Sequence, residues 1–193
     1  MKHLMLFETF YGLLQIRIMH GFLGDNKKYY NEAVDLAVSS VAEHINQPNA
    51  EYFIRHDIEE NVNKSISLFA LDPDDKVVGV LFMNTESIFQ NFDKYKNQGV
   101  KITELVDLTK YRDQKALHGF LFAVKKEDRK SYIAWMLIHE IPKRFTHHYD
   151  YFYGVQSEMF KKNVNYDKRA MKIAKLSGHF AGQGGHVYLK ELS

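Results

Sequence analysis

The sequence predicts an α+β domain in which a mixed β-sheet carries helices on its faces. Apolar residues recur every three or four positions between Tyr30 and Ile45, as in an amphipathic helix. Apolar runs at residues 66–71 and 77–82 flank the turn sequence Asp72-Pro73-Asp74-Asp75 and predict a β-hairpin. Farther along the chain, strand and helix patterns alternate, which predicts a βαβ unit within the same sheet.

The other elements are expected in the following order. Alternation at residues 15–19 predicts a first strand, and a second helix is expected from about residue 50. One or two helices should lie between residues 89 and 108, followed by a strand at 117–124, a helix at 131–145 and a strand at 151–155. A last helix running from Tyr166 to near Gly178, then two short terminal strands around the glycines at 182–185, completes the order.

Length and composition favour one ordinary globular domain covering residues 1–193. The 26 basic and 24 acidic residues give a net charge of +2, too small to suggest a nucleic-acid-binding protein. The chain has no cysteine, and no segment approaches the roughly 20 apolar residues of a membrane span. We therefore expect a soluble, unprocessed cytoplasmic protein with no membrane or nucleic-acid partner.

The segment from the strand at 117–124 into the following helix carries the most specific pattern. It reads Val124-Lys125-Lys126-Glu127-Asp128-Arg129-Lys130-Ser131-Tyr132-Ile133-Ala134-Trp135-Met136-Leu137. This resembles the acetyl-CoA-binding motif of the GNAT N-acetyltransferases: a valine, four residues, Arg or Gln, two residues, Gly, one residue, then Gly or Ala, with Leu three residues later. Arg129, Ala134 and Leu137 fall in register with it.

The resemblance implies a GNAT-like mixed sheet of about six to seven strands with helices on both faces, and acetyl-CoA as co-substrate. The long first helices look like those of the arylalkylamine N-acetyltransferase branch. The chain departs from the motif at Tyr132, which replaces its central glycine, and at Lys130, where a further glycine is common. Tyrosine keeps the backbone N–H that a phosphate needs but takes up more room than glycine.

By the resemblance, a set of residues should bind acetyl-CoA. Backbone groups of the strand should pair with pantetheine and supply the oxyanion donor, the start of the helix should hold the pyrophosphate, and an asparagine should hold the CoA arm. These residues are Phe122, Ala123, Val124, Arg129, Lys130, Ser131, Tyr132, Ile133, Ala134 and Asn165, with Asn163 as a neighbour of the last. Helix capping is the competing role for both asparagines.

Catalysis should need a base and a proton donor but no metal. His118, six residues before Val124, stands where some family members keep a carboxylate or histidine, and a structural hydrogen bond is its alternative role. The family's acid, a tyrosine four residues before the closing glycine, would fall on Ala174 when counted from Gly178. Tyr166 or Tyr153 is the expected substitute, and the thiolate could also take its proton from water.

The acceptor should be a primary amine of a small molecule or a protein, and Glu43 and Glu86 could attract it as a cation. Surface solvation is the alternative for both carboxylates. We expect a monomer or a homodimer. Because of Tyr132 and Ala174, the alternative function is a non-catalytic GNAT-like module that binds CoA or a partner through a degenerate pyrophosphate loop.

Overall fold

The computed structural model divides the chain into two compact units. The first comprises residues 1–84 and 121–140, and the second residues 85–120 and 141–193. The structure describes residues 8–11, 16–22, 27–43, 49, 51–52, 55–56, 58–59, 65–128, 132–157, 170–178 and 184–192. All structural statements below refer to these residues, and each unit is described by itself.

In the first unit, five strands follow the order β1-β2-β3-β4-β6. They are β1 (Glu8–Tyr11), β2 (Ile16–Phe22), β3 (Ile66–Leu71), β4 (Val77–Asn84) and the second half of β6 (Ala116–Val124). The pairs β1/β2, β2/β3 and β3/β4 are antiparallel. The unit also contains α1 (Lys27–Ala42), the 3-10 turn η3 (Lys126–Asp128) and most of α4 (Ile133–Phe145).

The turn between β3 and β4 is fixed by side chains from other elements. Asp75 adopts a φ of +62°, a left-handed conformation that aspartate tolerates better than most residues. Its carboxylate forms ion pairs with Arg17 of β2 and Lys28 of α1 and accepts a hydrogen bond from the Tyr29 hydroxyl at 3.0 Å. The hairpin is therefore tied both to its neighbouring strand and to α1.

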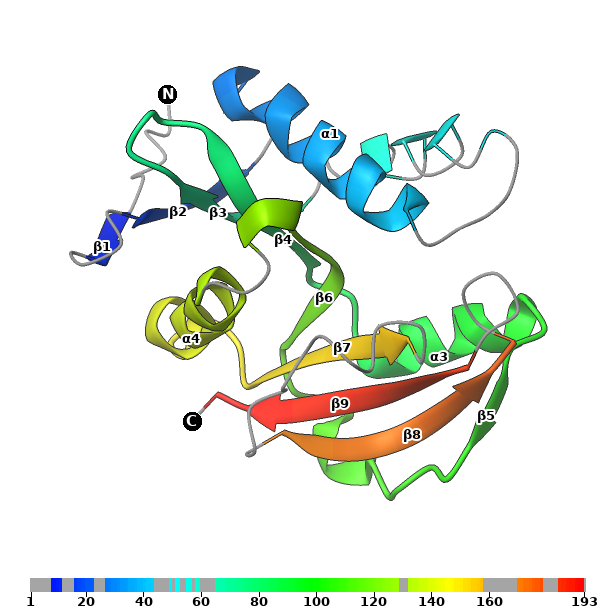
Figure 1. Cartoon of the computed structure of the whole chain (residues 1–193). Coiled ribbons are helices and arrows are strands. Elements are labelled where there is room, and N and C mark those ends of the chain that lie inside the picture. Colours follow the sequence, from blue (N-terminus) through cyan, green and yellow to red (C-terminus); the bar gives the residue numbers. More distant parts are fainter. Residues whose placement is uncertain are drawn as a thin grey trace. The chain divides into compact units, whose positions relative to one another are not determined.

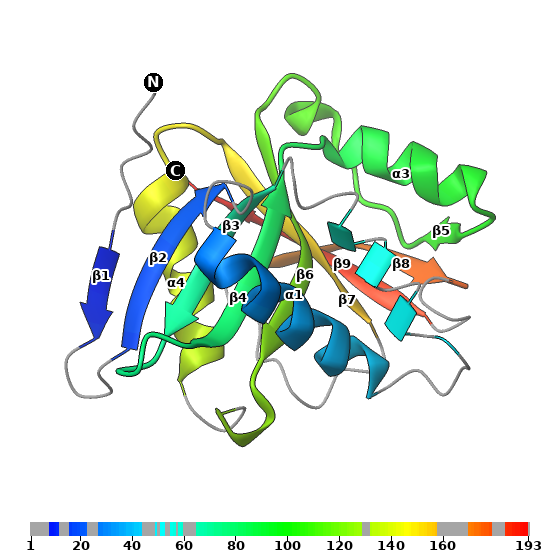
Figure 2. The same cartoon turned by 90° about the horizontal axis from the view of Figure 1, so that it is seen from above.

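Helices cover both faces of β4. Residues 77–83 are all buried, as expected when neither face of a strand meets water. Helix α1 packs on β4 from one side and α4 from the other (Figures 1 and 2). Helix α4 comes so close at Gly79 that a Cβ atom there would lie 2.6 Å from Cγ2 of Ile133 and 3.1 Å from Cδ1 of Leu137. The absent side chain of Gly79 thus sets the depth at which α4 sits.

In the second unit, the strand order is β6-β7-β9-β8-β5. Besides the first half of β6, its strands are β5 (Lys101–Thr103), β7 (Tyr151–Ser157), β8 (Met171–Ser177) and β9 (Gly185–Glu191). The β6/β7 pair is parallel, while β7/β9, β9/β8 and β8/β5 are antiparallel. Helix α3 (Ile88–Asn97) lies along one face of these strands, and η2 (Thr109–Tyr111) precedes β6 (Figure 1).

Helix α3 begins at a capping box. The Ser87 hydroxyl accepts a hydrogen bond from the Gln90 N–H, and the Gln90 side chain accepts one from the Ser87 N–H at 2.9 Å. The inner face of the helix then packs into a core with β7, β8 and β9. This core includes Ile88, Phe92, Tyr95, Tyr151, Tyr153, Ile173, Ala174, Leu176, Val187 and Leu189.

The predicted α+β class with a mixed sheet and helices is confirmed, with nine described strands rather than six or seven. The hairpin, the first long helix, the strand at 117–124, the helix at 131–145, the strand at 151–155 and the last terminal strand are also confirmed. The first of the two terminal strands, expected between residues 178 and 182, lies outside the described residues. Two predictions were wrong. Residues 101–103 form the edge strand β5 rather than helix, and residues 171–177 form β8, where a last helix was expected.

The error at β8 removes the basis for one inference from the sequence. Ala174 was compared with a helical tyrosine by counting back from Gly178, but Ala174 lies on a strand and its side chain is fully buried. The count therefore identifies no equivalent of that tyrosine.

Candidate active site

The predicted acetyl-CoA segment is a strand, a short turn and a helix. The end of β6 is held against β4, because the Lys125 N–H donates a hydrogen bond to the Val78 carbonyl at 2.9 Å. Ala123 and Val124 are buried, whereas Phe122 is half-buried. The position at which the chain leaves β6 and enters the segment before α4 is therefore fixed.

Helix α4 begins immediately after this loop. Its first intrahelical bond runs from the Met136 N–H to the Tyr132 carbonyl at 2.8 Å. Ile133 is buried and Ala134 is half-buried, so this turn is anchored by its apolar side. The Tyr132 side chain is 70% exposed, so the ring that replaces the motif glycine extends into water.

Several predicted residues lie outside the described part of the chain. These are Arg129, Lys130 and Ser131 in the loop, and Asn163, Asn165 and Tyr166 farther along. Their roles stay predictions.

Both predicted acceptor carboxylates form ion pairs within their own units. Glu43, just after α1, lies 4.0 Å from the ammonium group of Lys126, and Glu86 pairs with Lys94 of α3. Lys125 lies 3.5 Å from Glu127. Exposed ion pairs of this kind contribute little to stability and are readily exchanged for other partners.

His118 lies in a buried polar cluster of the second unit. Its side chain is 5% exposed and stacks on Tyr153, with ring centroids 4.5 Å apart and planes at 11°. The two residues are directly opposite in the β6/β7 register. The amide nitrogen of Asn91, on α3, lies 3.1 Å from Nε2 and 3.3 Å from Nδ1 of His118.

The hydrogen bonds of this cluster have a definite direction. The Tyr153 hydroxyl donates to the Glu86 carbonyl at 2.9 Å, so it accepts the hydrogen bond from the Asn91 amide at 3.3 Å. A second N–H of the same amide then faces the imidazole of His118. A ring nitrogen accepts a hydrogen bond only when it carries no proton. The Asn91 nitrogen is nearly equidistant from the two ring nitrogens of His118, so this contact holds the ring without selecting a tautomer.

Burial also fixes the protonation of the neighbouring phenols. Desolvation raises the pKa of Tyr153 well above its usual value, and it raises the pKa of Tyr95 in the same way. Both residues hydrogen-bond to Asn91, which opposes the shift without cancelling it. Tyr153 and Tyr95 therefore stay protonated at any physiological pH.

The parallel pairing of β6 with β7 is short. It covers four residue pairs, from Ala116–Tyr151 to Gly119–Gly154. Beyond it, β7 continues in register with β9 as far as Ser157. The pairing with β7 thus ends before Phe122, the first residue predicted to contact pantetheine.

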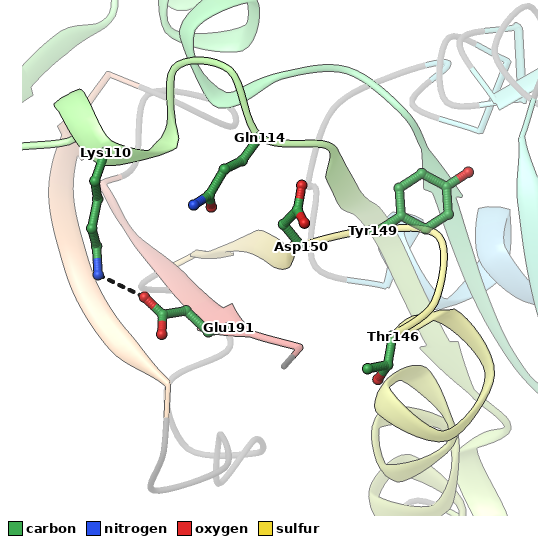
Figure 3. Close-up of a pocket in the computed structure, with 6 residues that line it drawn as sticks. All are labelled: Lys110, Gln114, Thr146, Tyr149, Asp150 and Glu191. Carbon is green, nitrogen blue, oxygen red and sulfur yellow. Dashed lines mark hydrogen bonds and ion pairs between the residues drawn. The ribbon is translucent and has the colours of Figure 1, made fainter.

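A polar cavity of about 240 Å³ lies elsewhere in the second unit and contains none of the predicted site residues. It is lined by Lys110, Gln114, Thr146, Tyr149, Asp150 and Glu191 (Figure 3). Lys110 bonds to Glu191 at 2.6 Å across it, and Asp150 accepts the Lys115 N–H at 2.6 Å. The first bond joins η2 to the end of β9 and the second joins the starts of β6 and β7, which indicates a structural role.

The described residues hold neither a metal-binding cluster nor a membrane-spanning helix. They contain no group of three or more His, Asp or Glu side chains placed to hold a metal ion. None of their helices is long and apolar enough to cross a membrane.

Comparison with solved structures places this geometry in a known fold. The chain is similar to arylalkylamine N-acetyltransferase 2 from Aedes aegypti, with a TM-score of 0.59, 12% identity and coverage of 91% of this chain and 99% of that one. It is also similar to a GNAT-family acetyltransferase from Staphylococcus aureus Mu50 (TM-score 0.55, 16% identity, coverage 92% and 99%). A third similar structure is a chain of the NatC complex bound to Gag peptide and CoA. Its TM-score is 0.56 and its identity 11%, with coverage of 91% of this chain and 99% of that one.

The chain has the GNAT fold. No protein-family model matches the sequence, and no curated protein matches it significantly. At identities this low, the likeness establishes the fold and leaves the activity to be argued from the residues.

Within this GNAT fold, sequence reasoning missed Asn91, the residue that links His118 to Tyr153. A signal was present: Ile88, Asn91, Phe92 and Tyr95 follow the spacing of one helix face, so a polar side chain occupies a core position. A buried amide needs hydrogen-bond partners. The sequence alone does not reveal that those partners lie on β6 and β7.

Proposed function

We propose that this protein is an N-acetyltransferase that moves the acetyl group of acetyl-CoA to a primary amine of a small molecule or a protein. The observation that carries the proposal is the combination of the GNAT fold with the β6–loop–α4 segment. In that segment β6 ends at Val124, α4 begins at Ile133, and the residue before α4, Tyr132, is exposed.

Acetyl-CoA binding would use mainly backbone groups. Pantetheine would pair with residues 122–124 of β6, beyond the end of the register with β7. The N–H groups in the first turn of a helix have no acceptor within the helix, and the helix dipole favours an anion there. The first turn of α4 would therefore hold the pyrophosphate, assisted by Lys125, Lys126, Arg129 and Lys130.

The reaction would proceed by direct attack. The amine nitrogen forms a bond to the thioester carbonyl carbon, the C–S bond breaks, and CoA leaves as a thiolate. A backbone N–H within 122–124 would stabilise the oxyanion, since preorganised donors are worth most where charge develops. The attacking amine loses one proton, and the thiolate gains one.

His118 would take the proton from the amine, directly or through one water molecule. Its support is the contact with Asn91 and the stacking on Tyr153, which hold the imidazole in a fixed orientation. Asn91 would then act as a positioning residue. Tyr166 or solvent would supply the thiolate's proton. Tyr153 is a poor donor, because burial raises its pKa and its hydroxyl already donates to the Glu86 carbonyl.

The alternative is a non-catalytic module that binds CoA or a partner. Two observations from the sequence suggested it, and the structure weakens both. The Tyr132 ring is largely exposed to water, and Ala174 lies on a strand, so the comparison with a helical tyrosine does not apply. We therefore favour the enzyme.

Glu43 and Glu86 remain the proposed attractors of a cationic acceptor. Their present ion pairs with Lys126 and Lys94 show that each carboxylate binds an ammonium group at its own site. A primary amine carries the same group in its protonated form. An acceptor could be a peptide N-terminus, a lysine or a small amine.

The test is acetyl transfer itself. Purified protein is incubated with acetyl-CoA and a panel of primary amines, and thiol release is followed, while calorimetry measures acetyl-CoA binding at increasing salt. We expect binding that weakens with salt, because phosphate contacts are ionic, and thiol release with at least one amine. Binding without thiol release would favour the non-catalytic module, and no binding at millimolar acetyl-CoA would exclude both.

A further inference from the structure

The first two turns of α4 carry an exposed aromatic stripe. Tyr132 is 70% exposed and Trp135 is 55% exposed, and the Trp135 indole stacks on the His139 ring with centroids 4.6 Å apart and planes at 14°. Positions 132, 135 and 139 have the spacing of one helix face. The opposite face, with Ile133, Met136 and Leu137, is buried.

An exposed tryptophan needs a reason. Tryptophan is highly buried on average, and burying such a ring contributes more than burying almost any other side chain. Here the indole instead lies flat against an imidazole, with more than half of its surface in water. A preformed, flat and accessible ring pair suits a second flat ring better than an aliphatic group.

The location of the stripe indicates which ring. Side chains on a helix lean toward its N-terminus, so Trp135 covers the turn that precedes its own Cα. That turn contains the first N–H groups of α4. The sequence before it, residues 125–130, has four basic and two acidic residues and so a net positive charge. The surface thus combines a helix N-terminus, positive charge and an aromatic face, which together fit a ligand that carries phosphates and a purine.

We propose that the Trp135–His139 pair is the docking surface for the adenine ring of acetyl-CoA. This inference rests on the proposed function and adds the residue that holds the nucleotide end. Trp135 lies three residues after Tyr132, about 4.5 Å along the axis at 1.5 Å per residue. At this separation, the adenosine of a ligand whose pyrophosphate binds the first turn of α4 could reach the Trp135 indole. His139, one turn farther on, holds the indole in its orientation.

Trp135 is the only tryptophan in the chain, so intrinsic fluorescence reports directly on this site. The wild-type protein is titrated with acetyl-CoA, with adenosine 3′,5′-bisphosphate and with acetyl-pantetheine, which lacks the nucleotide. We expect the first two to quench the emission and acetyl-pantetheine to leave it unchanged. Equal quenching by acetyl-pantetheine would overturn the assignment.

Variants test the energetic contribution by calorimetry. Trp135→Leu keeps apolar bulk but loses the aromatic face, and it should weaken acetyl-CoA binding roughly 5- to 150-fold, the range typical of one base stacked on an aromatic ring. Trp135→Phe should retain much of the affinity. Tyr52→Leu is the matched control, because Tyr52 is 69% exposed and stacks on His56 at 6.5 Å. It should bind like the wild type.

The outcomes separate this inference from the proposed function. If Trp135→Leu binds acetyl-CoA as tightly as the wild type, the adenine lies elsewhere while the acetyltransferase proposal stands. If Trp135→Leu instead converts a wild-type dimer to a monomer in sedimentation, the stripe is an interface between copies and the assignment is wrong. If the wild type neither binds acetyl-CoA nor releases thiol, the proposed function itself fails.

Discussion

His118 illustrates how one side chain can be structural and still suited to catalysis. Its ring is buried between α3 and β7, stacked on Tyr153 and bonded to Asn91. These contacts alone would explain a histidine at this position. They also fix the orientation of the ring, which a general base needs.

Replacing His118 by alanine should separate these roles. If His118 is the base, turnover should fall roughly 100- to 10,000-fold while acetyl-CoA affinity stays nearly unchanged. The measurements are steady-state thiol release over a range of pH and calorimetry with acetyl-CoA. His147→Ala, at an exposed position after α4, is the control and should retain activity. Full turnover in His118→Ala would make His118 structural, with Glu43 and Glu86 the next candidates.

Asn91→Asp refines the same prediction. Aspartate has almost the same shape, but it places a carboxylate where the amide donated, and a negative charge favours the protonated imidazole. The pH profile of turnover should therefore move to higher pH in Asn91→Asp. A merely structural Asn91 would change stability but leave the profile in place.

Tyr153 should make stability depend on alkaline pH. Burial raises the pKa of Tyr153 in the folded protein above that in the unfolded chain, which is about 10. The stability that the protonated phenol contributes is therefore complete below about pH 10. It is lost as the pH rises from there toward the folded pKa. The free energy of unfolding should fall by about 1.4 kcal/mol per pH unit for this group. Tyr153→Phe should be less stable at pH 7 by about 1–3 kcal/mol, since the Glu86 carbonyl loses its donor.

Urea unfolding between pH 7 and 11 measures this dependence. The deficit of Tyr153→Phe relative to wild type should shrink above pH 10, because the variant lacks one titrating phenol. Some dependence should persist, since Tyr95 is shifted in the same direction. Tyr52→Phe, at an exposed position, should follow the wild-type curve. A constant deficit at every pH would contradict the prediction.

Among the elements, α4 depends most on a single close contact. A methyl group at Gly79 would come within 2.6 Å of Cγ2 of Ile133, which sits on a stiff β-branched carbon and cannot swing away cheaply. Gly79→Ala should therefore displace the start of α4, cost about 1–3 kcal/mol of stability and weaken acetyl-CoA binding. Chemical unfolding and calorimetry measure the two effects.

A compensating change tests whether this contact is the cause. Ile133→Leu conserves volume but moves the branch from Cβ to Cγ, which removes the obstructing atom. The double variant Gly79→Ala/Ile133→Leu should recover part of both losses, giving a favourable coupling energy in a double-mutant cycle. Strictly additive effects would show that Gly79 acts through another neighbour.

The elements predicted from sequence were those with a long and regular pattern. Helix α1 and the β3/β4 hairpin have clean periodicities, and both were predicted correctly. Strand β8 was mistaken for helix because a register irregularity between Lys172 and Ala174 buries Ile173 and Ala174 consecutively. Together with Ala170, this imitates helical spacing. Strand β5, with three residues, is too short to show any period.

In the candidate site too, the part with a local sequence pattern was predicted and the contacts between distant residues were not. The strand–loop–helix segment carries a local motif, and its role was predicted from the resemblance of that motif to the GNAT acetyl-CoA-binding motif. The cluster around His118 depends on contacts between α3, β6 and β7, whose residues are distant in sequence: Asn91 and Tyr153 are separated by 62 positions. Burial and hydrogen bonding between residues so far apart in sequence arise only in the folded chain. A local sequence pattern therefore cannot predict them.

For the molecule as a whole, two elements are shared by both compact units. Strand β6 crosses the boundary between residues 120 and 121, and helix α4 crosses it between residues 140 and 141. If one unit unfolds, the half of β6 that belongs to it loses its hydrogen-bonded neighbours. The two parts of α4 would each be too short to form a stable helix alone. Each unit therefore contains part of a strand and part of a helix whose remaining residues belong to the other unit. The prediction that residues 1–193 form one domain can therefore be tested by unfolding.

We accordingly expect a single unfolding transition in urea. Trp135 fluorescence reports on the first unit, and a Tyr149→Trp substitution in a Trp135→Phe background reports on the second, where Tyr149 is half-buried against Phe145. The two probes should give the same midpoint and slope, as two-state unfolding of a single domain requires. Acetyl-CoA, if it binds only the folded chain, should raise both midpoints together. Two resolved midpoints, or a ligand shift confined to one probe, would mean that the units unfold independently despite their shared strand and helix.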